Sequence, residues 1–118
     1  MSTTEIGRSA EAATADYLEG LGYKLLLRNW RTRWHEVDIV AQSEQGVHFV
    51  EVKYRRSHNY GSGFDYITRD KSNRLRRAAL NWVQQNRYKG HYQIDVVSVS
   101  GPLDNLTLEY LPNAVEDY

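Results

Sequence analysis

The sequence predicts one α/β domain in which a mixed β-sheet is flanked by helices, with the elements in the order αβββαββ. The chain has 118 residues, of which 41% are hydrophobic, which suffices for a single core. Two segments repeat apolar residues at helical spacing, and five short segments have apolar or alternating strand patterns. Neither a repeat nor a linker divides the chain, so we expect a single domain over residues 1–118 that ends in an acidic tail from about residue 112.

The first predicted helix begins near the N-terminus. Ser2 and Glu5 can form a capping box, and Gly22 ends the helix. Its apolar face is predicted to carry Ile6, Ala10, Ala13, Tyr17 and Leu21. Glu11 lies about 100° round the helix from Ala10, so its carboxylate is expected at the edge of that face, leaning over the sheet.

Three strands are predicted next. Residues 23–28 are a short apolar strand, and residues 35–41 alternate between apolar and polar side chains. The turn sequence SEQG then leads into residues 47–54 as a hairpin. In this third strand Val50, Val52 and Tyr54 share one face, whereas Phe49, Glu51 and Lys53 share the other.

A Gly-rich loop, HNYGSG, separates the hairpin from the second half of the chain. Thr68 can cap a second helix. The buried stripe of that helix is predicted to contain Leu75, Ala78, Ala79, Trp82 and Val83. Residues 92–99 and 106–111 follow as strands, and they complete the sheet.

An acid and a base share one face of the third strand, and a second acid lies on the strand before it. If the hairpin pairs in register, Asp38 lies beside Glu51, and two neighbouring carboxylates repel unless a cation or a proton separates them. Oxygen ligands favour Mg²⁺ or Mn²⁺ over zinc, because the chain has no cysteine and no histidine pair nearby. Lys53 would then hold a phosphate oxygen or orient a metal-bound water.

The same residues have a simpler interpretation. A Glu and a Lys on one strand face usually form a solvated surface whose charges pair across strands. An E-x-K triplet is also short enough to recur by chance. On the residues alone, with Asp38 and the basic helix added, the two interpretations are evenly balanced.

Basic residues cluster after the hairpin although the formal net charge is zero. From residue 53 to residue 77 there are eight Lys or Arg against Asp65 and Asp70. From Asp95 onward there are five acids and no Lys or Arg. This asymmetry favours a polyanionic partner such as a nucleic acid, and the alternative is a helix face that is only solvated. The candidate phosphate contacts are Lys53, Arg55, Arg56, Arg69, Arg76 and Arg77.

Two tryptophans alternate with arginines before the second strand: Trp30, Arg31, Arg33 and Trp34. Aromatic rings beside guanidinium groups are suited to stacking on unpaired bases. Tryptophans are also often buried, so one of this pair is expected in the core and the stacking role stays open.

Composition excludes some classes of protein. Disulfides and thiolate sites are excluded because there is no cysteine. The N-terminus lacks the apolar centre of a signal peptide, and no apolar run reaches membrane-spanning length. We therefore expect a cytoplasmic protein without a membrane partner. The oligomeric state is not set by the sequence, which leaves a homodimer open.

The joint pattern of motifs resembles the PD-(D/E)XK nuclease superfamily, which includes Holliday junction resolvase-like proteins. More closely, the chain is similar to the YraN family of small bacterial proteins assigned as endonucleases. The matching stretches are GRSAEAA (7–13), LLLRNWR (25–31), EVDIVA (36–41), FVEVKYR (49–55), ITRDK (67–71) and YQIDVV (92–97). Together they span roughly residues 5–99.

The resemblance implies a restriction-endonuclease-like fold and a metal-dependent endonuclease that hydrolyses phosphodiester bonds of DNA, branched or structured DNA included. It implies that Glu11, Asp38 and Glu51 bind the metal together with the backbone carbonyl of Val52. It assigns Lys53 to catalysis beside Asp38 and Glu51, and it matches Lys71 to a lysine that starts the second helix in this family, which we count among the nucleic-acid contacts.

The chain departs from the family pattern at two positions. His35 stands where the family usually has Gly, and Tyr54 stands where Thr commonly follows E-V-K. A structural, hydrogen-bonded role is the expectation for His35, and a titrating group near the site is the alternative. Tyr54 should face away from Glu51 and pack under a helix, so neither departure removes an expected ligand.

Two rival functions remain at this stage. One is a nucleic-acid-binding module of the same fold that does not cleave. The other is an interaction protein in which Glu51 and Lys53 form only a salt bridge on the sheet. Clustered acids beside a phosphate site favour the enzyme, since binding alone does not require them.

Overall fold

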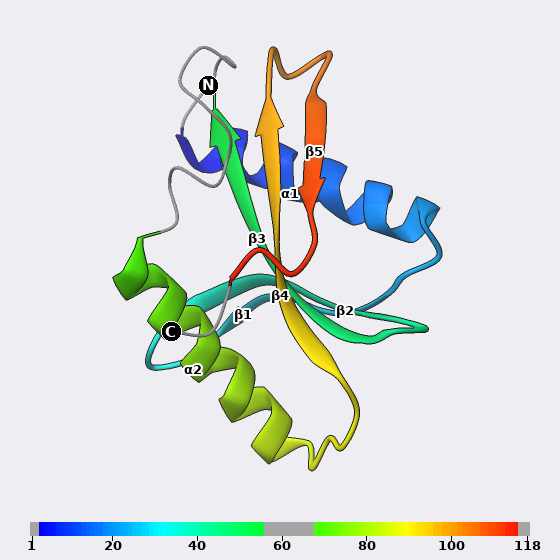
Figure 1. Ribbon diagram of the computed structural model, residues 1–118. Helices are drawn as coiled ribbons and strands as arrows, with labels where there is room; N and C mark the ends of the chain where they lie inside the picture. The colour runs from blue at the N-terminus through cyan, green and yellow to red at the C-terminus, as the bar shows by residue number, and fades with distance from the viewer. Residues whose placement is uncertain (1–2, 56–67, 116–118) are drawn as a thin grey trace.

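The structure is a computed structural model that describes residues 3–55 and 68–115 (Figure 1). It contains two helices and five strands in the order αβββαββ. The helices are α1 (Thr3–Gly20) and α2 (Arg69–Gln85), and the strands are β1 (Lys24–Arg31), β2 (Glu36–Ser43), β3 (Gly46–Arg55), β4 (Tyr92–Ser100) and β5 (Thr107–Leu111). The predicted fold class is confirmed, and the arrangement is consistent with a restriction-endonuclease-like fold.

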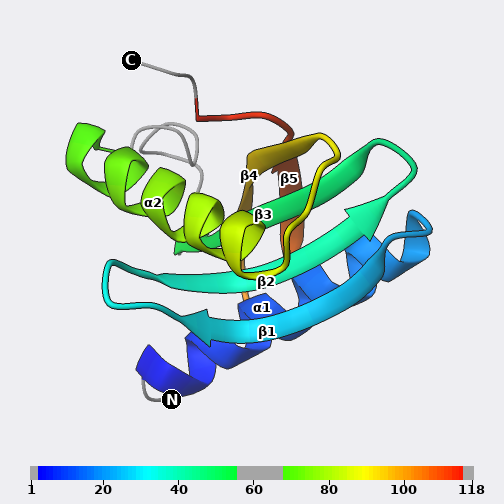
Figure 2. The ribbon, with the colours of Figure 1, turned by 90° about the horizontal axis from the view of Figure 1, so that it is seen from below.

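The sheet is mixed and its strands follow one another in chain order, β1-β2-β3-β4-β5. All neighbours are antiparallel except β3 and β4, which are parallel. A parallel pair requires a crossover connection, and α2 supplies it. Figure 2 shows α2 over one face of the sheet and α1 over the other.

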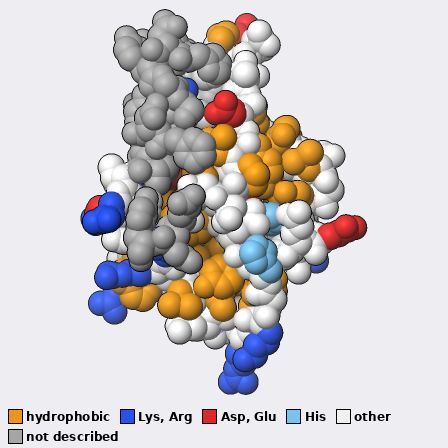
Figure 3. Space-filling view, in the orientation of Figure 1, with side chains coloured by type: hydrophobic (Ala, Val, Ile, Leu, Met, Phe, Trp, Pro, Cys, Tyr) orange, Lys and Arg blue, Asp and Glu red, His pale blue; other side chains and the backbone are white. Residues whose placement is uncertain are grey.

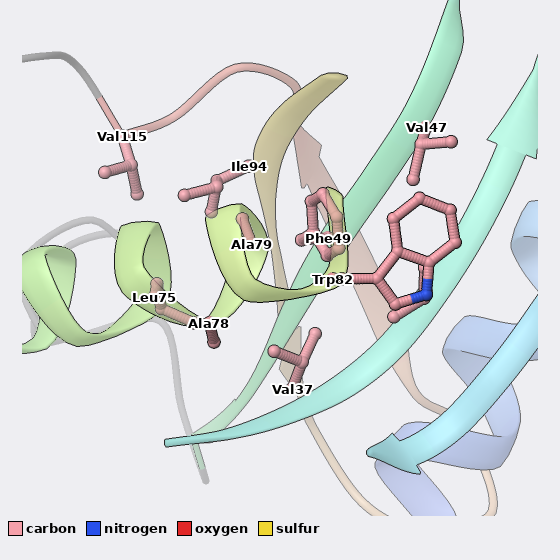
Figure 4. Close-up of a cluster of buried hydrophobic side chains, with 10 residues drawn as sticks. Val37, Val47, Phe49, Leu75, Ala78, Ala79, Trp82, Ile94 and Val115 are labelled. Atoms are coloured by element: carbon pink, nitrogen blue, oxygen red, sulfur yellow. The ribbon is translucent and has the colours of Figure 1, made fainter. Parts of the chain in front are cut away.

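Each helix covers its own hydrophobic cluster. Below α2, Phe49 packs edge-on against Trp82, with ring centroids 5.7 Å apart, and Leu75 and Val47 belong to the same cluster (Figure 4). Below α1, the cluster contains Ala10, Ala15, Leu18, Ile39, Ala41, Val50, Val97 and Val99. The sheet is therefore covered on both faces, which explains why β3 and β4 are so apolar.

The two faces of β3 are those that alternation predicts. Val50, Val52 and Tyr54 pack with the α1 cluster, whereas Phe49 packs with the α2 cluster. The hydroxyl of Tyr54 donates to the carbonyl oxygen of Gly101 at 2.7 Å. Tyr54 thus packs beneath a helix and points away from Glu51, as expected.

The start and the buried stripe of α2 also agree with the sequence. The side chain of Thr68 accepts a hydrogen bond from the backbone N–H of Lys71, which makes Thr68 the N-cap. Four of the five predicted stripe residues are buried: Leu75, Ala78, Ala79 and Trp82. The fifth, Val83, is only half-buried, and Ser72 is buried in addition.

The predicted face of α1 is wrong toward its C-terminal end. Tyr17 is 40% exposed and Leu21 is 50% exposed, whereas Thr14 and Leu18 are completely buried. Thr14 escaped the hydrophobic pattern because it is polar. Its hydroxyl donates to the carbonyl oxygen of Ala10 at 2.8 Å, so the side chain can be buried without an unsatisfied donor.

Strand β1 ends later than the predicted residues 23–28, since it continues to Arg31. Its register against β2 shifts between Leu25 and Leu27, and Asn29 has a positive φ of 52°. Such irregularities are hard to read from sequence. The predicted loop HNYGSG, with Asp65 and Arg56, lies outside the described residues. In the described part of the chain, no helix combines the length and the apolar character needed to cross a membrane.

Candidate active site

The site forms where β2 and β3 separate. Their recorded pairing runs from Ser43–Gly46 to Ile39–Val50, and the same register continued by one step aligns Asp38 with Glu51. At this point the Asp38 carboxylate takes the place of a backbone acceptor, because its Oδ2 accepts the N–H of Val52 at 2.8 Å. The hairpin therefore brings the two acids side by side, as its register predicts.

The two carboxylates perturb each other. Burial and, after it, the neighbouring Glu51 raise the pKa of Asp38 to about 9, since two adjacent anions are unfavourable where they are shielded from water. Glu51 is only 3% exposed. Burial acts to raise its pKa as well, but hydrogen bonds from His35, Asp38 and Lys71 outweigh it and hold that pKa well below the usual range. Near neutral pH Asp38 thus keeps a proton while Glu51 is ionised.

Glu51 is neutralised by a lysine from the other half of the chain. The ammonium nitrogen of Lys71, at the start of α2, lies 2.9 Å from Glu51 Oε2. His35 Nε2 lies 3.4 Å from the same oxygen. The rival interpretation, in which Glu51 and Lys53 form a salt bridge on the sheet, is not what the structure has, since among the described residues Glu51 pairs with Lys71 and contacts His35.

Lys53 lies one pleat along β3 and shares the site with Lys71. Partial burial lowers the pKa of Lys53, and the Lys71 ammonium within hydrogen-bond reach lowers it further. The pKa of Lys71 is raised although burial opposes this, because Lys53 and Glu51 both favour its charged form. Lys71 is therefore the firmly charged member of the pair, and Lys53 is the one more readily deprotonated.

Glu11 reaches the site from α1, at the edge of the sheet. Burial raises its pKa, and the nearby Glu36 contributes; hydrogen bonds with Asn29 and Asp38 act in the opposite direction. When its amide nitrogen faces the carboxylates, Asn29 donates to Glu11 Oε1 at 2.8 Å and to Glu36 Oε1 at 3.2 Å. The left-handed backbone at Asn29 is thus part of how Glu11 is held over Asp38.

The donor set suits a hard divalent cation. Glu11, Asp38 and Glu51 offer only oxygen atoms, and the proton that Asp38 retains is one that a cation would displace. As these side chains stand, however, no three acidic or histidine side chains within residues 3–55 and 68–115 converge closely enough to hold a metal ion. The Lys71 ammonium pairs with the Glu51 carboxylate, which such an ion would need as a ligand.

The aromatic and basic residues before β2 lie in different surroundings. Trp30 packs against the α2 cluster and is half-buried. Arg31 is exposed and pairs with Glu36, with Nη2 and Oε2 3.0 Å apart. The Arg33 guanidinium lies over the ring of Trp34, 5.5 Å from its centroid. The core therefore takes Trp30, whereas Trp34 borders the surface.

The basic residues after the hairpin also lie in different surroundings. Arg55 is buried, with 8% exposed, and pairs with Ser100 in the sheet register. Arg69 and Arg77 are exposed on α2. Arg76 is half-buried and lines a different hollow, beside His91 and Gln93. Arg56 is outside the described residues. Of this group, Arg69 and Arg77 present the most accessible charge.

Sequence reasoning missed two contacts of the site. The Lys71–Glu51 ion pair joins residues 20 positions apart in sequence through the placement of α2, which no local pattern specifies. Asn29 escaped notice because an asparagine in a strand carries no chemical signal by itself. His35 was expected to have a structural role, with a titrating group near the site as the alternative, and its contact with Glu51 places it at the site.

The chain is similar to known proteins over the region that contains the candidate site. The model of the family described as uncharacterised protein family UPF0102 matches residues 10–99. A UPF0102 protein of Mycolicibacterium vanbaalenii is 43% identical over 101 residues, covering 83% of this chain and 82% of the relative. A UPF0102 protein of Trichlorobacter lovleyi is 41% identical over 118 residues, with 94% and 90% covered. A UPF0102 protein of Pseudomonas putida is 38% identical over 118 residues, with 98% and 95% covered.

Proposed function

Because the chain belongs to the uncharacterised protein family UPF0102, whose description states no activity, we propose its function from the chemistry of the site: a metal-dependent endonuclease that hydrolyses phosphodiester bonds of DNA. UPF0102 corresponds to the YraN family, so the resemblance found in the sequence is confirmed at the level of the family. The observation that carries the proposal is the pair of adjacent carboxylates, Asp38 and Glu51, with two lysines beside them.

The acidic residues have one common role in this proposal. Glu11, Asp38 and Glu51 would hold Mg²⁺ or Mn²⁺ together with the carbonyl of Val52. The ion would supply charge stabilisation at the phosphate and a more acidic bound water. Asn29 fixes the direction of the Glu11 carboxylate through its hydrogen bond.

The two lysines have different roles. Lys53 carries a lowered pKa, so it can exchange a proton with the attacking water or hold a phosphate oxygen. Lys71 is firmly charged and is a point contact for the phosphate backbone. An ammonium that faces bulk water keeps its ordinary pKa, so a lysine on a solvated strand could contact phosphate but would not readily exchange a proton near neutral pH.

A second candidate is a nucleic-acid-binding module of the same fold that does not cleave. The Lys71–Glu51 ion pair favours it, because that contact neutralises an expected metal ligand without any ion. The endonuclease is preferred because a binding module gains nothing from the costly contact between Asp38 and Glu51.

The deciding experiment is a cleavage assay on branched, flapped and linear DNA with Mg²⁺ or Mn²⁺. Lys53→Met keeps the length and the strand packing of the side chain but removes the ammonium. We expect cleavage to fall by about 10²–10³, the cost of losing one transition-state donor, while Mn²⁺ binding measured by calorimetry is retained.

Lys24→Met is the matched control, since Lys24 is an exposed strand lysine on β1. Cleavage that persists unchanged in Lys53→Met would remove this lysine from the mechanism. DNA binding without any cleavage by the parent protein would leave the binding module as the function.

A further inference from the structure

Two adjoining hollows lie between the turn Thr32–His35 and one side of α2. Their volumes are about 460 and 280 Å³. The larger is lined by Arg33, Trp34, Asp70, Asn73, Arg74 and Arg77. The smaller is lined by Trp34, Arg77, Leu80, Asn81 and Gln84. Since Trp34 and Arg77 stand in both walls, we treat the two hollows as one surface and call it the Trp34 groove.

The Trp34 groove carries an excess of positive charge. Its walls hold three arginines and one acid, Asp70. Arg74 pairs with Asp70, with Nη2 and Oδ2 3.2 Å apart, but both side chains are more than half exposed, so the pair is weak. Arg77 forms no ion pair with any described residue. In Figure 3, Lys and Arg side chains gather at the lower left, where Figure 1 places α2. An anionic ligand therefore fits this groove.

The groove also presents an aromatic ring that is carried by an ordered turn. Trp34 lies in a turn that is closed by four hydrogen bonds. Thr32 Oγ1 accepts the N–H groups of Trp34 and His35 and donates to the carbonyl of His35, which also accepts the N–H of Thr32. Because the backbone that carries the ring is already ordered, less conformational freedom is lost when a ligand stacks on Trp34.

Ring and charge together point to an unpaired nucleic-acid strand. Successive bases of a single strand can stack on aromatic side chains while guanidinium groups contact the phosphates. The bases of a duplex are already stacked on one another, so Trp34 would find no free base face there. The Arg33 guanidinium over Trp34 adds a second planar group to the same wall.

One end of the groove adjoins the candidate active site. His35 follows Trp34 in the chain, and its Nε2 is 3.4 Å from Glu51. Lys71 follows Asp70, and its Nζ is 2.9 Å from Glu51. Arg74 and Arg77 continue along α2 at intervals of three residues, on one side of the helix. Lys71, Arg74 and Arg77 thus form a continuous basic path from Glu51 to Trp34. A DNA strand with a phosphate at Glu51 can follow it.

We propose that the Trp34 groove binds an unpaired strand of DNA that adjoins the phosphate at Glu51, with a base stacked on Trp34 and phosphates on Arg74 and Arg77. The inference rests on the proposed endonuclease function and narrows its substrate class. The substrate is DNA in which a single-stranded segment flanks the cleaved bond, as in flapped or branched DNA.

The test measures DNA binding in the presence of a chelator, so that cleavage plays no part. A short oligothymidylate and a duplex of the same length, each carrying a fluorescent label, are titrated separately with the protein, and the anisotropy of the label is followed. In the parent protein we also expect the single strand to quench the tryptophan emission. Trp34→Ala should weaken single-strand binding about 5- to 150-fold, the range for losing one stacked base, and leave duplex binding unchanged.

Two further variants locate the effect. Trp34→Phe keeps an aromatic face, so it should restore most of the affinity for the single strand. Tyr92→Ala removes another aromatic ring, 38% exposed but in a different hollow, and should change nothing. Melting curves of each variant show whether the fold is retained.

The phosphate contacts are tested through salt. Arg77→Gln should reduce the slope of log affinity against log salt by about 0.7, the value for one contact with a single strand. Arg87→Gln is the control, because Arg87 is exposed just beyond the end of α2 and does not line the groove. An equal loss in both variants would mean general attraction to charge and would overturn the assignment of Arg77.

The outcomes separate this inference from the proposed function. If Trp34→Ala loses the single strand selectively while no DNA is ever cleaved, the groove assignment holds and the endonuclease fails. If the protein cleaves DNA but Trp34→Ala binds and cleaves flapped and linear DNA like the parent, the endonuclease holds and the groove assignment is overturned. An equal loss of single-strand and duplex binding overturns the stacking role.

Discussion

Two clusters of buried polar groups lie in this sheet, and they differ in the partners of their acidic side chains. One surrounds Asp95 on β4, whose side chain is 0% exposed. Its Oδ2 accepts from His48 Nδ1 at 2.7 Å and from the hydroxyl of Tyr110. Its Oδ1 accepts from the Gln93 side chain at 2.7 Å and from the N–H of Asn113 at 2.8 Å. The other cluster surrounds Asp38 and Glu51, where two acids lie side by side and each perturbs the pKa of the other.

The difference appears in the pKa values. Burial acts to raise the pKa of Asp95, but His48, Tyr110, Asn113 and Gln93 outweigh it and lower the pKa below its usual value. The pKa of Asp38 is raised to about 9. An acid whose acceptors are all satisfied contributes to stability, whereas an acid kept protonated beside a carboxylate is held there at a cost. Two acids in one sheet can therefore differ in pKa because of their partners, and the strongly raised pKa makes Asp38 the candidate for a functional role.

The largest expected effect is on the Asp95 cluster. Asp95→Asn replaces one acceptor oxygen with a donor that faces donors, and it removes the negative charge beside His48. We expect a loss of about 3–5 kcal/mol in the free energy of unfolding, as for breaking a buried pair, measured by urea denaturation. Asp104→Asn, at an exposed position between β4 and β5, should change little. A small loss in Asp95→Asn would end the distinction between the two clusters.

The second prediction concerns metal at the Asp38–Glu51 cluster. Mn²⁺ should raise the thermal midpoint, because it binds only the native state. At a hundredfold excess over the dissociation constant the gain is about 2.7 kcal/mol. Glu51→Gln should abolish the gain, whereas Glu109→Gln, at an exposed position on β5, should keep it. If the parent protein shows no shift at any Mn²⁺ concentration, this cluster is not a metal site without DNA.

The contrast between the clusters explains what could be predicted from the sequence. The order of elements, the two faces of β3 and the alignment of Asp38 with Glu51 follow from alternation and from hairpin register, which are local. Glu51 and Lys53 lie in the same strand, so their common face was readable. The buried face of α1 was not, because Thr14 satisfies its own hydroxyl within the helix.

Contacts between distant segments could not be predicted in the same way. Lys71 reaches Glu51 only because the crossover helix starts above that end of β3. His48 and Asp95 pair across two parallel strands, and their register is set by the same crossover. The residue pattern of one segment carries no information on how it pairs with a distant segment. The partners of Glu51 could therefore be identified only from the structure.

The third prediction tests whether the Lys71 ammonium competes with a metal ion for Glu51. Lys71→Met leaves a carboxylate that is only 3% exposed without its ammonium partner. With a chelator present, the variant should lose about 1–3 kcal/mol, as for a buried polar group left unsatisfied. Mn²⁺ should then stabilise the variant more than the parent, because its competitor is gone. Lys89→Met, at an exposed position after α2, is the control. A variant that melts like the parent and gains no more from Mn²⁺ would show that Lys71 does not compete for the site.

The last expected effect is a gain in stability, and it depends on pH. The raised pKa of Asp38, about 9 against an ordinary 3.8, means that the folded protein keeps a proton which the unfolded chain has released. Stability therefore falls as pH rises from about 4 to about 9, since in this window the native state binds more protons. Asp38→Asn is neutral at every pH, and its amide oxygen can still accept the N–H of Val52. Because one pKa unit corresponds to about 1.4 kcal/mol, we expect the variant with a chelator present to exceed the parent by at least that amount near pH 8, and by less near pH 4. Urea denaturation across this range measures the difference, and parallel curves for the two proteins would show that Asp38 is satisfied in the fold, as Asp95 is.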